Sequence, residues 1–155
     1  MAVKTKHVQR RSLEFADYDQ LLEEVRRLSS APTRQLGNWT LGQICEHVSK
    51  AMDMAIDGAP FKAPFFIRWV GPYFKKRVMA QPMTPGFQLP KIARPLLPTN
   101  VEDAAGVAMV ERSVARLRGT SQRQPHFAFG PMTREEWDHL HLKHAAMHLS
   151  FIELA

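Results

Sequence analysis

The stretch "NWTLGQICEHVSKAMDMAIDG", residues 38–58, predicts the helix around which the rest of the fold is organised. Asn38 or Thr40 can cap its amino end, because a short polar side chain there accepts a hydrogen bond from a free backbone N–H. Apolar residues then recur at helical spacing along one side, namely Leu41, Ile44, Val48, Ala51, Met52, Ala55 and Ile56. Gly58 and Pro60 follow in the order that ends a helix. We therefore predict an amphipathic helix that buries one stripe.

Two more segments carry the same period, one before this stretch and one after it. Residues 17–28 begin with Asp17 as the N-cap and Gln20 three positions later, which is a capping-box pattern, and Pro32 stops the helix. Residues from about 100 to 117 show a weaker pattern. Its apolar side consists of Val107, Val110, Val114 and Leu117. Both segments are predicted as amphipathic helices.

A further helix is predicted at the carboxyl end of the chain. It opens at Thr133, where Glu136 completes a capping box, and is expected to continue to the last residue. A shorter helix is expected within residues 65–79, broken near Gly71 and Pro72. No segment shows a convincing alternation of apolar and polar residues. We predict an all-α fold, a four-helix bundle with a long Pro-rich basic insertion between its second and third helices.

Length and composition indicate one soluble domain that spans residues 1–155. The hydrophobic content of 45% and the charged content of 23% are ordinary for a globular protein. No apolar run approaches the roughly 18–20 residues of a transmembrane helix, and the basic start of the chain lacks the apolar region of a secretory signal. The single cysteine, Cys45, excludes an intrachain disulfide. These features lead us to expect a cytoplasmic protein.

The net charge of +6 is concentrated in the insertion, residues 59–100. This segment has no acidic residue and eight of the eleven prolines, and its charge of +7 leaves −1 for the rest of the chain. The basic residues are Lys62, Arg68, Lys75, Lys76, Arg77, Lys91 and Arg94, and the aromatic residues among them include Phe65, Phe66, Trp69, Tyr73 and Phe74. The sequence contains no recognisable nucleic-acid-binding motif, which disfavours nucleic acid as a partner.

Several roles for this segment stay open at the level of sequence. It can fold over the bundle and bind an anionic substrate or thiol, with Arg68, Arg77, Trp69 and Tyr73 as the candidate substrate-binding residues. It can instead be an interfacial segment that touches anionic lipid, or a surface for a protein partner. A solvated basic loop whose aromatic residues cover the core is the simplest alternative.

Four of the seven histidines lie in "HLHLKHAAMHLSF", residues 139–151. On a helical wheel with about 100° per residue, His141, His144 and His148 point towards the apolar side, while His139 points away from it. A buried imidazole without partners costs about 1–3 kcal/mol, so three of them on one stripe need an explanation. A bound metal ion supplies one, because it takes one nitrogen from each ring.

His144 and His148 are spaced four residues apart, so their rings can share one ion. His141 lies about 10.5 Å along the axis from His148, too far for the same ion, and is predicted to be a supporting residue or a hydrogen-bonded core histidine. His47 lies at the edge of the apolar stripe of residues 38–58 and is predicted as the third ligand. Three imidazoles suit a divalent transition metal such as Zn, Ni or Fe and leave positions for a substrate.

The remaining reactive side chains are assigned simpler roles. We expect Cys45 to be a small buried apolar residue, His7 and His139 to be solvated, and His126 to lie in a loop near the site or in a turn. The carboxylates of the second helix, Glu46, Asp53 and Asp57, are expected to be solvated. No catalytic residue is identified, and the lack of a general base favours thiol activation over hydrolysis.

The stretch "NWTLGQICEHVSKAMDMAIDG", followed by "FGPMTREEWDHLHLKHAAMHLSF" at 129–151, resembles the DinB-like superfamily of metal-binding four-helix bundles. More narrowly it is similar to a bacterial branch catalogued as a domain of unknown function, and the likeness covers nearly the whole chain. The superfamily places one histidine on the second helix and an HxxxH pair on the last, which match His47, His144 and His148. The resemblance implies relatives among thiol-dependent transferases, although the insertion at 59–100 departs from them.

Three functions from different classes follow from these expectations. The first is a metal-dependent enzyme that activates a thiol or water, a transferase or hydrolase acting on a small molecule. The second is a protein that binds metal or a small ligand without catalysis. The third is a helical interaction module in which the histidines are structural. A monomer and a homodimer are both compatible with the sequence.

Overall fold

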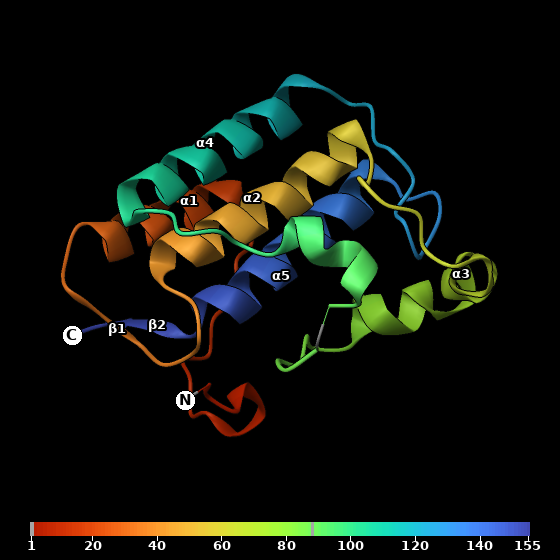
Figure 1. Ribbon diagram of the computed structural model, residues 1–155. Coiled ribbons are helices and arrows are strands. Elements are labelled where there is room, and N and C mark those ends of the chain that lie inside the picture. Colours follow the sequence, from red (N-terminus) through yellow and green to blue (C-terminus); the bar gives the residue numbers. More distant parts are fainter. Residues whose placement is uncertain (1, 88) are drawn as a thin grey trace.

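The computed structural model describes residues 2–87 and 89–155, and over them the fold is mostly helical, as the sequence predicts (Figure 1). In chain order the elements are η1 (Thr5–His7), α1 (Tyr18–Ser29), β1 (Thr33–Gln35), α2 (Leu41–Asp57), α3 (Phe65–Ala80), η2 (Lys91–Leu96), α4 (Asp103–Gly119), α5 (Arg134–Leu149) and β2 (Ile152–Leu154). Helix α2 contacts α1, α4, α5 and η2, and α1 also contacts α4 and α5. Helix α2 is therefore the central element of the fold.

The predicted caps form at the helix starts. Asp17 accepts a hydrogen bond from a backbone N–H in the first turn of α1. Thr40 and Gln43 form a reciprocal capping box at the start of α2, with distances of 3.2 and 3.0 Å between donor and acceptor. Thr133 and Glu136 do the same for α5. These bonds satisfy backbone donors that a helix start leaves free, so the boundaries are set locally.

One apolar core joins α1, α2, α4 and α5. Its fully buried side chains include Trp137, Leu21, Leu28, Leu41, Ile44, Met52, Leu117, Leu149 and Ile152. A smaller cluster of Met54, Ala93 and Leu96 attaches η2 to the side of α2. None of the helices within the described ranges combines the length and the apolar character needed to cross a bilayer.

The carboxyl end of the chain differs from the prediction. Helix α5 ends at Leu149, and Ile152–Leu154 pairs with Thr33–Gln35 as an antiparallel two-stranded sheet. The backbone oxygen of Phe151 accepts a hydrogen bond from the N–H of Leu36 at 2.8 Å, so the chain after α5 is satisfied by this pairing. Strands of three residues are too short to show alternation in a sequence, which explains why the helix was predicted to continue.

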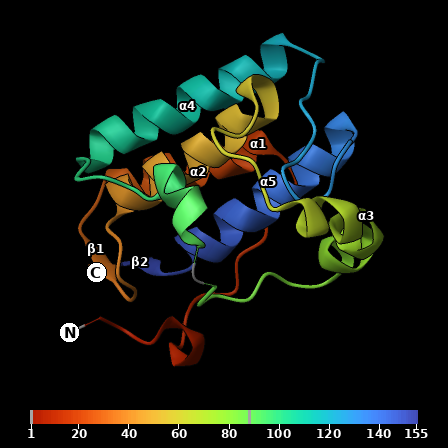
Figure 2. The ribbon, with the colours of Figure 1, turned by 45° about the vertical axis from the view of Figure 1, so that its right-hand side comes forward.

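The predicted break near Gly71 and Pro72 is a change of direction and not an interruption, because α3 is helical from Phe65 to Ala80 with Pro72 inside it, and its axis bends along its length (Figures 1 and 2). Proline disfavours the helical conformation at the preceding residue, since its ring meets that residue's N–H and Cβ. Gly71 has no Cβ, which relieves part of this clash. The missing Cβ of Gly71 also lets the turn at 126–130 lie close against α3, because a Cβ built there would be only 1.9 Å from the backbone oxygen of Ala128.

The close contact of α2 with α4 generates a test of the core. A Cβ on Gly106 would lie 2.7 Å from the backbone oxygen of Gly42, and backbone atoms on both helices would have to move. We expect Gly106→Ala to lower the free energy of unfolding by about 1–3 kcal/mol, measured by urea denaturation.

Gly119→Ala is the matched control, because it lies in the same helix and a Cβ there meets no atom within 4 Å. Its stability should be unchanged or raised by up to about 1 kcal/mol, since alanine is the better helix former. Equal behaviour of the two variants would contradict the packing described for α2 and α4.

Candidate metal centre

Helices α2 and α5 bring the three predicted ligands together where they contact each other. His47 comes from α2, and His144 and His148 lie one turn apart on α5. The Nε2 atom of His144 is 3.1 Å from Nε2 of His47 and 3.0 Å from Nε2 of His148. One ligand nitrogen from each ring lies within 4.8 Å of the other two. Residues almost a hundred positions apart in the chain thus form one cluster.

Two of the separations between these nitrogens are compatible with a single transition-metal ion. Ligand nitrogens at about 2.0–2.1 Å from an ion are separated by about 2.9 Å at right angles and about 3.3 Å in a tetrahedron. The distances of 3.0 and 3.1 Å fall between these limits. Three neutral imidazoles are the donor type that Zn, Ni and Fe accept. Among the described residues no carboxylate or cysteine joins this group, so the cluster consists of the three histidines alone.

A backbone carbonyl orients the ring of His47. Its Nδ1 lies 2.7 Å from the oxygen of Leu96, and because a carbonyl only accepts, Nδ1 must carry the proton and donate it. The other nitrogen, Nε2, is then unprotonated and faces the other two histidines. This is the arrangement by which metal-binding histidines are usually held in one tautomer.

The segment that carries the Leu96 oxygen is fastened to α2 by two neighbours of His47. Glu46 accepts hydrogen bonds from the backbone N–H of Thr99 at 2.6 Å and from its hydroxyl at 3.1 Å. Lys50 donates to the oxygen of Leu97 at 2.8 Å and forms an ion pair with Glu46. Glu46 and Lys50 of α2 therefore hold the segment whose Leu96 carbonyl orients the ring of His47.

Glu46 corrects the expectation that the carboxylates of this helix are solvated. It is buried, and although burial acts to raise its pKa, the hydrogen bonds from Lys50 and Thr99 hold the pKa below its ordinary value. Asp57 is exposed as expected, while Asp53 is partly buried, and both pair with Arg116 of α4. The helical wheel missed Glu46 because it does not include the segment that folds back over α2.

Trp39 is a neighbour of the cluster that the sequence did not reveal. Its ring stacks on His148 with 5.3 Å between centroids, and it lies tilted against His47 at 4.9 Å. Burial lowers the pKa of all three histidines, and the neighbouring imidazoles lower those of His144 and His148 further. The rings are thus kept neutral, which is the form that binds a metal ion.

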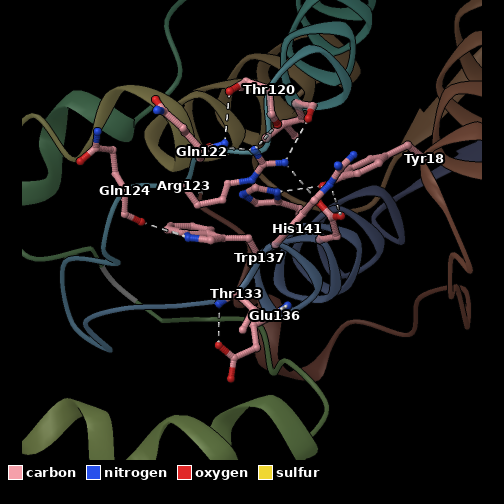
Figure 3. A network of polar contacts seen from close by, with 12 residues as sticks. Tyr18, Thr120, Gln122, Arg123, Gln124, Thr133, Glu136, Trp137 and His141 are labelled. Atoms are coloured by element: carbon pink, nitrogen blue, oxygen red, sulfur yellow. Dashed lines mark hydrogen bonds and ion pairs between the residues drawn. The ribbon is translucent and has the colours of Figure 1, made fainter.

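His141 belongs to a separate polar network in the core, which Figure 3 shows. The hydroxyl of Tyr18 donates to Asp138 at 2.7 Å, so the contact of 3.0 Å between the Tyr18 oxygen and Nδ1 of His141 is a bond that the histidine donates. Burial, together with the charge of Arg123, lowers the pKa of His141 to about 3. Of the two expected roles, these contacts agree with that of a hydrogen-bonded core histidine.

The remaining reactive side chains take the simpler roles expected of them. His126 lies in a turn, where its Nδ1 accepts hydrogen bonds from the N–H groups of Ala128 and Phe129 at 3.1 Å. Cys45 is buried in the apolar core, and burial raises the pKa of its thiol to about 12. His7 and His139 are exposed. These residues add no ligand to the cluster.

The candidate substrate-binding residues lie elsewhere. Arg68, Trp69, Tyr73 and Arg77 are all exposed on α3. Within the described chain, no hydrogen bond or ring contact joins these four side chains to the three histidines. Helix α3 instead makes its polar contacts with α5 and the residues just before it, for example from Lys75 to Glu136. A role for these residues in binding a substrate stays a prediction.

Comparison with known proteins identifies a family for nearly the whole chain. Residues 7–154 match the family model described as "Protein of unknown function (DUF1569)". No curated protein and no solved structure matches the chain.

The burial of His141 predicts a loss of stability in acid. The group has a pKa of about 3 when folded and an ordinary value near 6.5 when unfolded, so the unfolded chain binds more protons between these values. Stability should therefore fall as pH decreases through this window, with a slope from this residue of about 1.4 kcal/mol per pH unit.

The contribution of His141 can be isolated by substitution. His141→Gln should reduce the slope of the free energy of unfolding against pH by about 1.4 kcal/mol per pH unit, which corresponds to the uptake of one proton. The slope is measured by urea denaturation between pH 7.5 and about 4.5. His139→Gln, on the exposed face of the same helix, should keep the slope of the unchanged protein. An unchanged slope in His141→Gln would show that the folded protein protonates this residue normally.

Proposed function

We propose that this chain, which belongs to the DUF1569 family, holds one divalent transition-metal ion between His47, His144 and His148. The convergence of the three Nε2 atoms carries this proposal. The Nε2 atom of His144 lies about 3 Å from that of each of the other two rings. If the rings are neutral and no cation is bound, lone pairs face each other at this distance and repel, so some of these nitrogens have no partner. The bond from His47 to Leu96 supports it, since that bond directs an unprotonated nitrogen into the cluster.

We further propose that α1, α2, α4 and α5 form a DinB-like four-helix bundle, with residues 59–100 as an insertion. The contacts of α2 with the other three helices and their common apolar core support this assignment. In such bundles, ligands come from facing helices and point inwards. The HxxxH pair on α5 and the single histidine on α2 follow that pattern.

The chemistry that we propose is activation of a thiol or of water. A divalent ion with three neutral ligands acts as a Lewis acid that lowers the pKa of a group bound to it. The chain's own residues would keep the imidazoles neutral by burial and hold the His47 ring through Leu96. No carboxylate within the described chain joins the cluster to serve as a base, which favours a thiol, since a thiol loses its proton more easily than water.

The candidate partners are a thiol cofactor or a small anionic molecule. Arg68 and Arg77, with positive charge, and Trp69 and Tyr73, with apolar rings, are the residues that the sequence offers for such a partner. All four are exposed on α3, and over residues 2–87 and 89–155 no hydrogen bond or ring contact joins them to the three histidines, so this role has no support from the geometry. The buried single cysteine is compatible with a reducing cytoplasm as the place of action.

Metal binding without catalysis is the second candidate function. The observation that favours it is the exposure of the four candidate substrate residues on α3, away from the cluster. In this case the bound ion would only stabilise the contact between α2 and α5. A purely structural role for the histidines, as in an interaction module, is the outcome left if no metal binds.

The metal centre is tested by elemental analysis and by titration with Zn, Ni and Fe(II). We expect about one ion per chain, and at least a 100-fold weaker affinity after His47→Ala, His144→Ala or His148→Ala. His139→Ala is the matched control, because it removes an exposed histidine from the same helix as two of the ligands. Wild-type protein without metal above background would overturn the proposal.

Catalysis is tested with the loaded protein. A panel of low-molecular-weight thiols with electrophiles, and a panel of esters and amides, should give turnover in one class if the site is an enzyme. His144→Ala should lose that turnover while His139→Ala keeps it. Stoichiometric metal without turnover would instead support the second candidate function.

A further inference from the structure

Helix α3 exposes large aromatic side chains to an unusual degree. Phe65, Trp69 and Tyr73 are 82%, 75% and 81% exposed, and no residue of α3 is buried. These three residues are spaced by four, which places Phe65 and Trp69 in one row on the first half of the helix and Tyr73 just after Pro72. Phe66, Val70 and Phe74 form a second exposed row beside the first. Contiguous exposed apolar surface of this kind usually marks a binding surface.

The opposite side of α3 is attached to the rest of the protein. Gly71, Lys75 and Met79, spaced by four, are the residues of α3 that are partly buried, while the others are exposed. Gly71 approaches the oxygen of Ala128, and Met79 packs against the main core. Lys75 pairs with Glu136 at 2.9 Å. Figures 1 and 2 show α3 at the periphery of the molecule.

The carboxyl end of α3 is also held. Lys143 of α5 donates to the backbone oxygens of Val78 and Met79 at 3.2 and 2.7 Å, and to that of Gln81 at 2.5 Å. A cation at this position satisfies carbonyls that a helix end leaves free and interacts favourably with its dipole. The aromatic rows are therefore presented outwards by a helix that is fastened along its opposite side and at its end.

The charge around the aromatic rows has one sign. Arg68, Lys76 and Arg77 are exposed on α3, Lys62 is exposed just before it, and residues 59–100 contain no acidic residue. Long basic side chains can reach outward past an apolar surface to meet negative groups at its edge. The surface thus combines an apolar and aromatic centre with a cationic border.

We propose that α3 docks the protein on a membrane surface that carries anionic lipid headgroups. The aromatic rows would enter the interface between headgroups and acyl chains, and the basic residues would pair with lipid phosphates. Tryptophan and tyrosine suit this depth, because each ring has an apolar body and one polar atom. The inference does not rest on the metal centre, and each can fail without the other.

Charge and side-chain chemistry favour an anionic membrane as the partner of α3 over a second copy of the chain and over single-stranded nucleic acid. A symmetric pair of copies joined through α3 would bring two segments of charge +7 together, which opposes association. Single-stranded nucleic acid would also attract the charge and stack on aromatic rings. Yet four of the exposed side chains have no hydrogen-bonding group, namely Phe65, Phe66, Val70 and Phe74. Such side chains are more stable in the apolar part of a lipid interface than against nucleic acid.

The test is flotation of the full-length protein with vesicles of phosphatidylcholine alone and of equal parts phosphatidylcholine and phosphatidylglycerol. We expect binding only to the anionic vesicles, weakened by added salt. Trp69→Ser/Tyr73→Ser should reduce partitioning at least about tenfold, because it removes apolar contact without changing the charge. Arg68→Glu/Arg77→Glu should reduce it by at least as much.

Lys4→Glu/Arg112→Glu is the matched charge control, because it also lowers the net charge from +6 to +2 and changes only exposed residues outside 59–100. It should keep most of the binding, and circular dichroism should show that each variant retains its helices. The tryptophan emission should shift to the blue on anionic vesicles, and this shift should be lost in Trp69→Phe.

Three outcomes would overturn the inference. The first is no binding of the unchanged protein to anionic vesicles, including the case in which it binds a single-stranded oligonucleotide instead. The second is an equal loss of binding in the control Lys4→Glu/Arg112→Glu, which would mean that only net charge matters. The third is a dimer in solution that Trp69→Ser/Tyr73→Ser converts to monomer, because α3 would then be covered by a second copy.

Discussion

The contact between α2 and α5 has to accommodate three imidazole rings at a place where apolar side chains would normally meet. The Nε2 atoms of His47, His144 and His148 face one another there, with two of their separations at 3.1 and 3.0 Å. Burial keeps the rings neutral, and neutral rings offer lone pairs that need a partner. The proposed metal ion would meet that need, and the hydrogen bond from His47 to the oxygen of Leu96 orients one of the three rings.

The Pro-rich segment between α2 and α4 has two different relations to the rest of the protein. Its carboxyl end lies against α2, where Glu46 and Lys50 hold residues 97–99 and Leu96 accepts the hydrogen bond from His47. Its first half forms α3, which is attached on one side and exposes aromatic rows on the other. One segment can therefore support the candidate metal centre and also present a separate surface.

The sequence predicted that His47, His144 and His148 lie together, and it predicted their surroundings poorly. Helical spacing was sufficient for His144 and His148, and the apolar stripe of α2 was sufficient for the position of His47. The orienting carbonyl of Leu96 had no signal, because every residue has a backbone oxygen. Glu46 was expected to be solvated because the wheel treats a helix as if only one face were covered, whereas η2 and the residues after it cover a second face. Trp39 was missed because it precedes the helix and reaches the histidines only through the fold.

The sequence by itself determined the helices that carry the core and the side on which each histidine lies. Caps, apolar periods and the four-residue spacing act over a few positions, so they can be read directly along the chain. Only the tertiary structure decided what the histidines face, where α5 gives way to β2, and that α3 continues through Pro72. These outcomes depend on groups distant in the chain, such as the N–H of Leu36 and the oxygen of Ala128, whose positions no local pattern encodes.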